Sequence, residues 1–373
     1  MPHGVIRRPP HVRLNWVESC PSRSLSEVAL LSHSPCPPSE RKPGMRRRDF
    51  IIFLAGAMAA WPLAARAQQG ERVRRIGVLW PGDENDPEQT TSLSAFTQGV
   101  ASLGWIDGRN VRMDVRWGRL DSSRMRAGAQ ELVGSQPDII VTLTTPDTVA
   151  VQRETRTIPI VFAAVGDPVA GGLVPRLNQP GGNITGFATF EPTLGGKWLE
   201  LLTEIAPGLK RAAIMFNPDT ALASASMPSL ETAARSLKIE PIITPVHSDV
   251  EIETAIIGLG REPGGGLVVM PDLFMFVHRA SIISAAARNN IPAVAPGSSF
   301  AKDGGLLSYG PDIADNCRRA ATYADRILRG EKPGDLPVQF PTKFEMVLNL
   351  KTAKALGLAV PTSILARITE VIE

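Results

Sequence analysis

The sequence predicts an α/β protein made of two doubly wound lobes, each built on a parallel sheet. From Arg75 onward, short apolar runs alternate with amphipathic segments of helical period, which is the pattern of βαβ units. A concentrated turn signal, Pro-Gly-Gly-Asn at residues 180–183, separates two such series. About 300 residues is enough chain for two lobes of ordinary domain size.

The first series opens with a β-branched and aromatic strand at 76–80, which Pro81 and Gly82 end. A helix follows from about Thr91, because apolar residues recur at spacings of three and four from there to Leu103. The other elements predicted for this lobe are a strand at 111–117, a helix at 122–134 capped by Ser122 or Ser123, a strand at 138–143, a helix at 146–153, a strand at 158–165, and an extended segment at 184–187 that crosses between the lobes.

The second series repeats this plan. It predicts helices at 197–205, 227–237, 250–259 and 277–289, and strands at 211–216, 240–246, 266–270, 293–294 and 306–308. An amphipathic helix at 317–329 is expected to return to the first lobe, and a late strand at 340–350 to the second. We therefore expect lobe 1 to comprise 74–186 plus 309–338, and lobe 2 to comprise 187–308 plus 339–373.

Residues 45–67 have the pattern of a secretory signal peptide. Three arginines at 46–48 precede an uncharged run of 14 residues from Phe50 to Leu63, and Ala65 and Ala67 suit cleavage after Ala67. This run is shorter than the roughly 20 residues that span a bilayer. The arginines fit the general secretory route and the twin-arginine route equally well. No Cys lies near the cleavage site, so we expect a protein without a lipid anchor in a Gram-negative periplasm.

Residues 1–44 carry scattered Pro, Arg, Ser and His without periodicity, which predicts a disordered leader. A signal peptide does not normally begin 45 residues into a chain, so Met45 is expected to be the true start and residues 1–44 not to be translated.

Removal of residues 1–67 reverses the charge balance. These residues hold 10 of the 40 Lys and Arg and 4 of the 37 Asp and Glu, which leaves 30 basic and 33 acidic residues, a net charge of −3 in place of +3. Nothing in this balance predicts a nucleic-acid partner. Cys317 is the one cysteine after residue 67, so an intramolecular disulfide is excluded and stability must come from the core.

The usual catalytic and cofactor-binding patterns are absent from the sequence. His247 and His278 are the two histidines after residue 67, and neither stands in a metal-binding spacing. The chain contains no G-x-S-x-G elbow and no phosphate-binding loop, and no G-x-G-x-x-G follows the first strand. We therefore predict no enzymatic activity, no cofactor and no metal site.

Polar residues at the carboxyl ends of predicted strands are the candidate site, because ligands bind there in open α/β sheets. Thr144, Thr145 and Pro146 close the third strand and open a helix, where hydroxyls and free backbone N–H groups suit a carboxylate. A purely capping role for Thr145 is supported equally.

Other strand ends supply further candidates. Asp167, with Gly166, suits either a helix cap or a ligand ammonium, and Asp272 suits a cation or a cap on the helix after it. The remaining candidates are Asn217 at a strand end and Trp80 and Tyr309 as aromatic walls, with core packing as the alternative for Trp80.

Several segments taken in order resemble a known family. They are Ile-Gly-Val-Leu at 76–79, Pro-Asp-Ile-Ile-Val at 137–141 before Thr-Thr-Pro at 144–146, Ile-Pro-Ile-Val-Phe at 158–162 running to Val-Gly-Asp-Pro at 165–168, Gly-Asn-Ile-Thr-Gly at 182–186, and Tyr-Gly at 309–310. Together they resemble the ABC-transporter substrate-binding proteins of the type I periplasmic fold, in particular the branch that resembles tryptophan- and tyrosine-binding proteins. The resemblance covers about residues 74–360.

The resemblance implies two lobes joined by three crossovers, with a solute held in the cleft and closure by hinge motion. It places the cleft-lining loops at Trp80 to Asp83, including Gly82, at 144–146 and at Val165 to Asp167, with Asn217, Asp272 and Tyr309 from the rest of the chain. It also implies a monomer that delivers a small-molecule solute to an ABC permease in the inner membrane.

The chain departs from the family in two loops. The loop at 82–89 is acidic where relatives carry a Thr/Gln-rich loop leading to His-Pro, which disfavours an anionic solute. The segment 221–225 is rich in Ala where relatives carry polar contact residues. These departures leave a small polar organic solute, an amino acid or a related molecule, as the expected ligand.

Three functions remain as hypotheses. The leading one is the periplasmic solute-binding component of an ABC importer. The second is a ligand-sensing protein of the same fold that signals to a membrane receptor, because binding and closure would be identical. The third is an enzyme whose reacting groups would come from Asp167, Asp272 or Thr145, and it has the least support.

Overall fold

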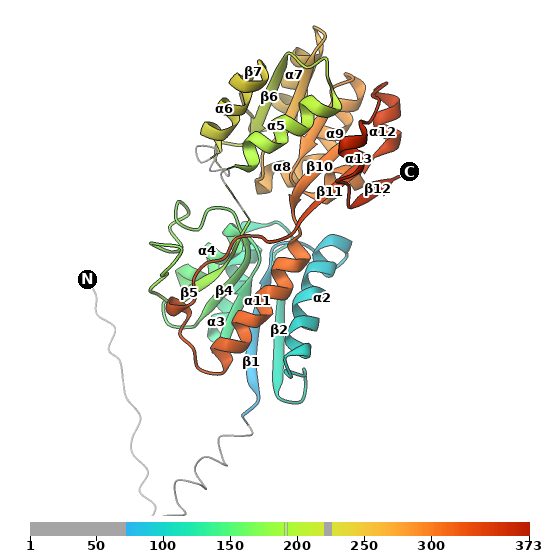
Figure 1. Ribbon diagram of the computed structural model, residues 1–373. Helices are drawn as coiled ribbons and strands as arrows, with labels where there is room; N and C mark the ends of the chain where they lie inside the picture. The colour runs from blue at the N-terminus through green and yellow to red at the C-terminus, as the bar shows by residue number, and fades with distance from the viewer. Residues whose placement is uncertain (1–71, 190, 192, 220–225) are drawn as a thin grey trace, which may run out of the picture. The chain divides into compact units, whose positions relative to one another are not determined.

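The computed structural model describes residues 72–189, 191, 193–219 and 226–373, and these form two α/β lobes (Figure 1). The predicted signal peptide, the leader at 1–44 and the Ala-rich segment 221–225 lie outside the described residues. Each lobe is built on its own sheet with helices on both faces, so the predicted fold class is confirmed. Within the described part of the chain, no helix is long and apolar enough to cross a membrane.

The first lobe contains a five-stranded sheet in the order β2-β1-β3-β4-β5. All its strand pairs are parallel, so the carboxyl ends of the strands meet at one edge. The segment at 184–187, expected as a short extended piece that crosses between the lobes, pairs with β4 as the edge strand. The strands are β1 (Arg74–Trp80), β2 (Val111–Trp117), β3 (Ile139–Thr142), β4 (Ile160–Val165) and β5 (Ile184–Ala188).

Four helices cover this sheet: α2 (Pro87–Ser102), α3 (Ser122–Gly134), α4 (Thr145–Glu154) and α11 (Ile313–Leu328). The pair α2 and α11 packs side by side over one core, and α3 and α4 over the other (Figure 1). Helix α2 begins earlier than predicted, because Asp86 accepts hydrogen bonds from the backbone N–H groups of Glu88 and Gln89. Similarly, Asp121 and not a serine caps α3.

The second lobe contains a seven-stranded sheet in the order β12-β11-β10-β9-β8-β6-β7. Its strands are parallel to their neighbours except at the β10–β11 pair, which is antiparallel. The strands are β6 (Arg211–Phe216), β7 (Glu240–Pro245), β8 (Gly265–Val269), β9 (Ala293–Ala295), β10 (Leu307–Pro311), β11 (Phe344–Asn349) and β12 (Glu370–Ile372). Strand β10 extends past the expected lobe boundary at 309, because β11 supplies backbone partners as far as Pro311.

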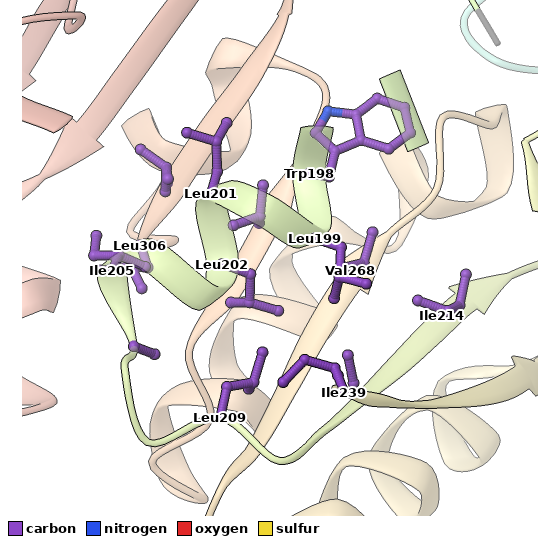
Figure 2. Packing of buried hydrophobic residues seen from close by; sticks show 14 of the residues in the cluster. Trp198, Leu199, Leu201, Leu202, Ile205, Leu209, Ile214, Ile239, Val268 and Leu306 are labelled. Atoms are coloured by element: carbon purple, nitrogen blue, oxygen red, sulfur yellow. The ribbon is translucent and has the colours of Figure 1, made fainter. Parts of the chain in front are cut away.

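Helices of the second lobe are α5 (Leu194–Ile205), α6 (Met227–Leu237), α7 (Asp249–Gly260), α8 (Leu273–Val277), α9 (Arg279–Arg288), α10 (Ser298–Lys302), α12 (Leu350–Ala355) and α13 (Thr362–Leu365), while the short 3-10 helix η3 (Pro333–Asp335) lies against β5. The helix predicted at 277–289 corresponds to α9, and the short helix α8 precedes it, with His278 between the two. The apolar residues of α5 are directed at β6 and β8 (Figure 2), and they form the main core of this lobe.

The chain passes between the lobes three times, after β5, after β10 and before β11. Two of these passages pair with each other, since the backbone N–H of Ala188 donates to Gln339 at 2.8 Å and that of Gln339 donates to Gly186 at 3.0 Å. At the third, the N–H of Asp312 donates to the carbonyl of Lys343 at 3.0 Å. The crossover before β11 is therefore hydrogen-bonded to each of the other two.

Replacement of Leu202 by Ala should destabilise the second lobe strongly, because this side chain is fully buried in the α5 core. We expect a loss of about 2–5 kcal/mol in the free energy of unfolding, measured by urea denaturation. Ile243→Ala on the edge strand β7, where the side chain is 50% exposed, should cost about 0.5 kcal/mol or less. Equal losses for the two variants would contradict this packing.

Candidate functional site

The end of β3 is shaped by a capping box at the start of α4. Thr144 is the N-cap and Asp147 is its partner three residues later. The Asp147 carboxylate accepts from the backbone N–H of Leu143 at 2.6 Å and from that of Thr144 at 2.9 Å, and the Thr144 hydroxyl also donates to it. Thr144 therefore caps the helix, not Thr145, and Thr145 and Pro146 follow, half-buried, in its first turn.

Asp147 has no exposed surface, and burial raises the pKa of its carboxyl to about 7, although hydrogen bonds from Thr144 and Leu143 act to lower it. A folded-state pKa above the ordinary value means that folding favours the protonated acid. The resulting stability is complete below about pH 4 and is lost as the pH rises through 7.

The carboxylate of Asp167, after the end of β4, accepts hydrogen bonds within the turn that follows it. Its Oδ1 accepts from the N–H groups of Val169 at 3.0 Å and Ala170 at 2.9 Å. Val165 is fully buried in the core, and Gly166 is half-buried between them. Of these three candidates, Gly166 and Asp167 have surface left for a solute.

The end of β1 places its three candidates in different surroundings. Trp80 has no exposed surface and packs in the core between the sheet and α2, and its indole N–H is buried without a hydrogen-bond partner among the described residues. Gly82 lies directly under the side chain of Gln89, so any larger residue would displace that side chain. Asp83 is half-buried and forms a 3.2 Å ion pair with Arg119.

Asp272 joins two strand ends of the second lobe. Its Oδ1 accepts from the N–H of Met275 at 2.7 Å, which caps α8, and its Oδ2 accepts from the N–H of Asn217 at 3.2 Å. The amide of Asn217 in turn donates to the carbonyl of Val246 at 3.0 Å. The two residues therefore fix the ends of β6, β7 and β8 relative to one another.

Tyr309 lies on the face of β10 that packs against the α5 core. Its ring stacks on Phe344 with a centroid distance of 5.7 Å, and its backbone carbonyl accepts from the indole N–H of Trp198 at 2.7 Å. The ring is half-buried, so part of it remains available.

The structure also brings together a polar cluster that the sequence did not predict. Glu88 at the start of α2 lies near Ser299 of α10, whose hydroxyl acts to lower the pKa of the Glu88 carboxyl, and Ser298 acts in the same way on Glu345 of β11. Glu88 and Ser299 belong to different lobes. The sequence carries one signal for it, because Pro296 and Gly297 end a strand just before the two serines, as at the other strand ends.

Burial raises the pKa of both carboxyls in this cluster. For Glu88, Ser299, Lys302 and Arg279 act to lower the pKa, whereas Asp86 adds to the increase. For Glu345, the Ser298 hydroxyl and Lys302 act to lower it, whereas Asp312 and Glu88 raise it further. The two carboxyls therefore disfavour each other's ionisation.

The chain belongs to the family described as ABC transporter substrate binding protein, whose model matches residues 85–372. The predicted family resemblance is thus confirmed. This is a family of solute-binding proteins that work with ABC transporters, not a family of enzymes. The two-lobed architecture is that of the type I periplasmic-binding proteins.

Individual relatives agree with this assignment. A tyrosine-binding protein of Clostridioides difficile is 28% identical over 273 residues, which is 73% of this chain and 78% of the relative. A conserved domain protein from Vibrio cholerae has a similar structure, with a TM-score of 0.73 and 28% identity over 80% of this chain and all of that one. An ABC domain from Streptococcus pneumoniae in complex with L-Trp matches with a TM-score of 0.73 and 24% identity, covering 80% and 99% of the two chains.

The pKa of Asp147 gives a testable pH dependence. The free energy of unfolding should fall as the pH rises from 5 to 7, with a slope of at most about 1.4 kcal/mol per pH unit. Asp147→Asn should remove this slope, whereas Glu231→Gln on the exposed face of α6 should leave it unchanged. Urea denaturation at several pH values measures it. An unaltered slope in Asp147→Asn would mean that the carboxylate stays ionised.

Proposed function

We propose that the protein is the periplasmic solute-binding component of an ABC importer and that it binds an amino acid, with tyrosine as the first candidate. The family match carries this proposal, because it covers both lobes. The tyrosine-binding relative supports the choice of solute. The signal-peptide pattern at 45–67 supports export, and we propose that the mature protein acts as a monomer with a permease of the inner membrane.

We propose that the solute binds at the carboxyl edges of the two sheets and that closure of the lobes around it creates the form that the permease recognises. A solute stabilises that form only by contacts that the open form lacks. The candidate contacts are those predicted from the sequence: Trp80, Gly82, Asp83, Thr144, Thr145, Pro146, Val165, Gly166, Asp167, Asn217, Asp272 and Tyr309. The buried Trp80 and Val165 would act by shaping the edge behind the solute.

A thermal-shift screen tests the proposed function directly. A solute that binds only the folded protein raises the melting temperature, by an amount that corresponds to about 2.7 kcal/mol at 100 times the Kd. We expect a shift with tyrosine or a related amino acid. The protein must first be freed of any bound solute by unfolding and refolding. Shifts in melting temperature with sugars or purines alone would contradict the proposed solute class.

Thr145→Val tests whether the start of α4 holds the solute carboxylate. Loss of one hydroxyl hydrogen bond should weaken binding roughly 2- to 12-fold, the equivalent of about 0.5–1.5 kcal/mol, with little change in melting temperature. Thr322→Val on the exposed face of α11 is the matched control, because it removes a hydroxyl far along the chain from the strand ends. Calorimetric titration measures both, and an unchanged affinity in Thr145→Val would remove this position from the site.

A further inference from the structure

The polar cluster of Glu88, Ser298, Ser299, Ser308 and Glu345 contains buried oxygens that the described protein leaves without partners. Glu88 Oε2 and the Ser308 hydroxyl are both inaccessible and make no hydrogen bond within the described residues. Ser308 itself is only 1% exposed. A buried polar group without a partner costs free energy, so such atoms indicate a missing partner.

Strand register places Ser308 in the cluster. Ser308 pairs with Val347 and Gly310 pairs with Glu345, so Ser308 and Glu345 lie on one face of the β10–β11 pair. The alternate residues, such as Leu307 and Met346, belong to the α5 core on the other face. Helix α10, which carries Ser298 and Ser299, contacts both strands. The unpartnered hydroxyl therefore faces the same side of the sheet as the Glu345 carboxylate.

The charges around the cluster are unbalanced. Asp86 acts on Glu88, and Asp312 and Glu88 act on Glu345, so four carboxyls stand in or beside the cluster, with Lys302 and Arg279 as the cations that act on it. Both cations already have other carboxylate partners, since Lys302 pairs with Glu370 at 3.0 Å and Arg279 with Asp303 at 2.6 Å. The cluster thus has an excess of negative charge that is partly removed from water.

Next to Glu88, the side chain of Gln89 provides a second, independent observation. Gln89 is 8% exposed, and its Oε1 is buried without a hydrogen-bond partner in the described chain. Both residues stand in the first turn of α2, the helix that follows β1 after the loop at 81–86. The serines of α10 likewise stand at the start of the helix that follows β9. The unpartnered acceptors therefore lie at the strand ends where open α/β sheets bind ligands.

We propose that this cluster binds the ammonium group of the solute, with Glu88 as its main charged partner. An ammonium is a compact cation with three N–H donors, which is the complement of a cluster that has acceptors and negative charge in excess. The inference rests on the proposed solute-binding function and makes it more specific. The solute must carry a protonated amine, whereas its carboxylate is dispensable for this subsite.

Three molecules with the same phenol ring distinguish the contribution of the solute amine from that of its carboxylate. They are L-tyrosine, tyramine, which lacks the carboxylate, and 3-(4-hydroxyphenyl)propionate, which lacks the amine. Calorimetric titration of the purified protein should give binding of tyrosine and tyramine and at least tenfold weaker binding of the propionate. Binding of tyrosine and the propionate with equal affinity would overturn the subsite and leave the solute-binding function intact. Binding of none of the three would overturn tyrosine as the solute and this subsite with it.

Variants test the residue assignment. Glu88→Gln keeps the shape of the side chain. It should weaken the binding of tyrosine at least tenfold and leave the affinity for the propionate unchanged. Ser308→Ala should weaken the binding of tyrosine less than Glu88→Gln does. It provides a second variant in case Glu88→Gln folds poorly. Glu84→Gln is the matched control and should have no effect, because Glu84 is an exposed acid of the loop before α2 that pairs with Arg119. Equal affinity of tyrosine for Glu88→Gln and the original protein would overturn the assignment.

Discussion

The parallel arrangement of strands is the constraint on which the rest of the structure depends. A parallel strand must be followed by a crossover before the next one, so the carboxyl ends of all the strands in the first lobe meet at one edge. The same holds for β6 to β10 in the second lobe. Every candidate contact except Tyr309 stands at such an end, and the backbone pairs between Ala188 and Gln339 and between Asp312 and Lys343 keep the crossovers together.

Acidic residues at these edges divide into two kinds. Asp147, Asp167 and Asp272 each accept hydrogen bonds from two backbone N–H groups, so their carboxyl oxygens already stabilise turns and helix starts. Glu88 is different, because one of its oxygens is buried without a partner among the described residues. Hydrogen bonding to the backbone thus distinguishes acids that shape the site from the acid that is suited to a solute.

Much of the fold could be predicted from the sequence, since hydrophobic periodicity is local. The strands at Val111–Trp117 and Arg211–Phe216 and the helices at Ser122–Gly134 and Met227–Leu237 have the predicted bounds. The predicted bounds are wrong where contacts outside the local apolar pattern determine where an element begins or ends. Strand β10 continues through Gly310 and Pro311, beyond its predicted end at residue 308, because β11 pairs with them. Asp86 extends α2 because its carboxylate caps backbone groups that apolar spacing does not reveal.

The candidate site was predicted only in part, for the same reason. Strand ends can be located from sequence, which found Thr144, Asp167 and Asp272, but whether each acid is used by the backbone requires the folded chain. The contact of Glu88 with Ser299 joins residues more than 200 positions apart, and no local pattern predicts it. The two serines follow the short strand Ala293–Ala295, so they too stand after a strand end.

Mass spectrometry of the solute released when the native protein is denatured tests the central claim most directly. The account predicts one small molecule in a stoichiometric amount, and that molecule carries a primary amine. A stoichiometric solute without an amine, such as a simple carboxylate or a sugar, would contradict it.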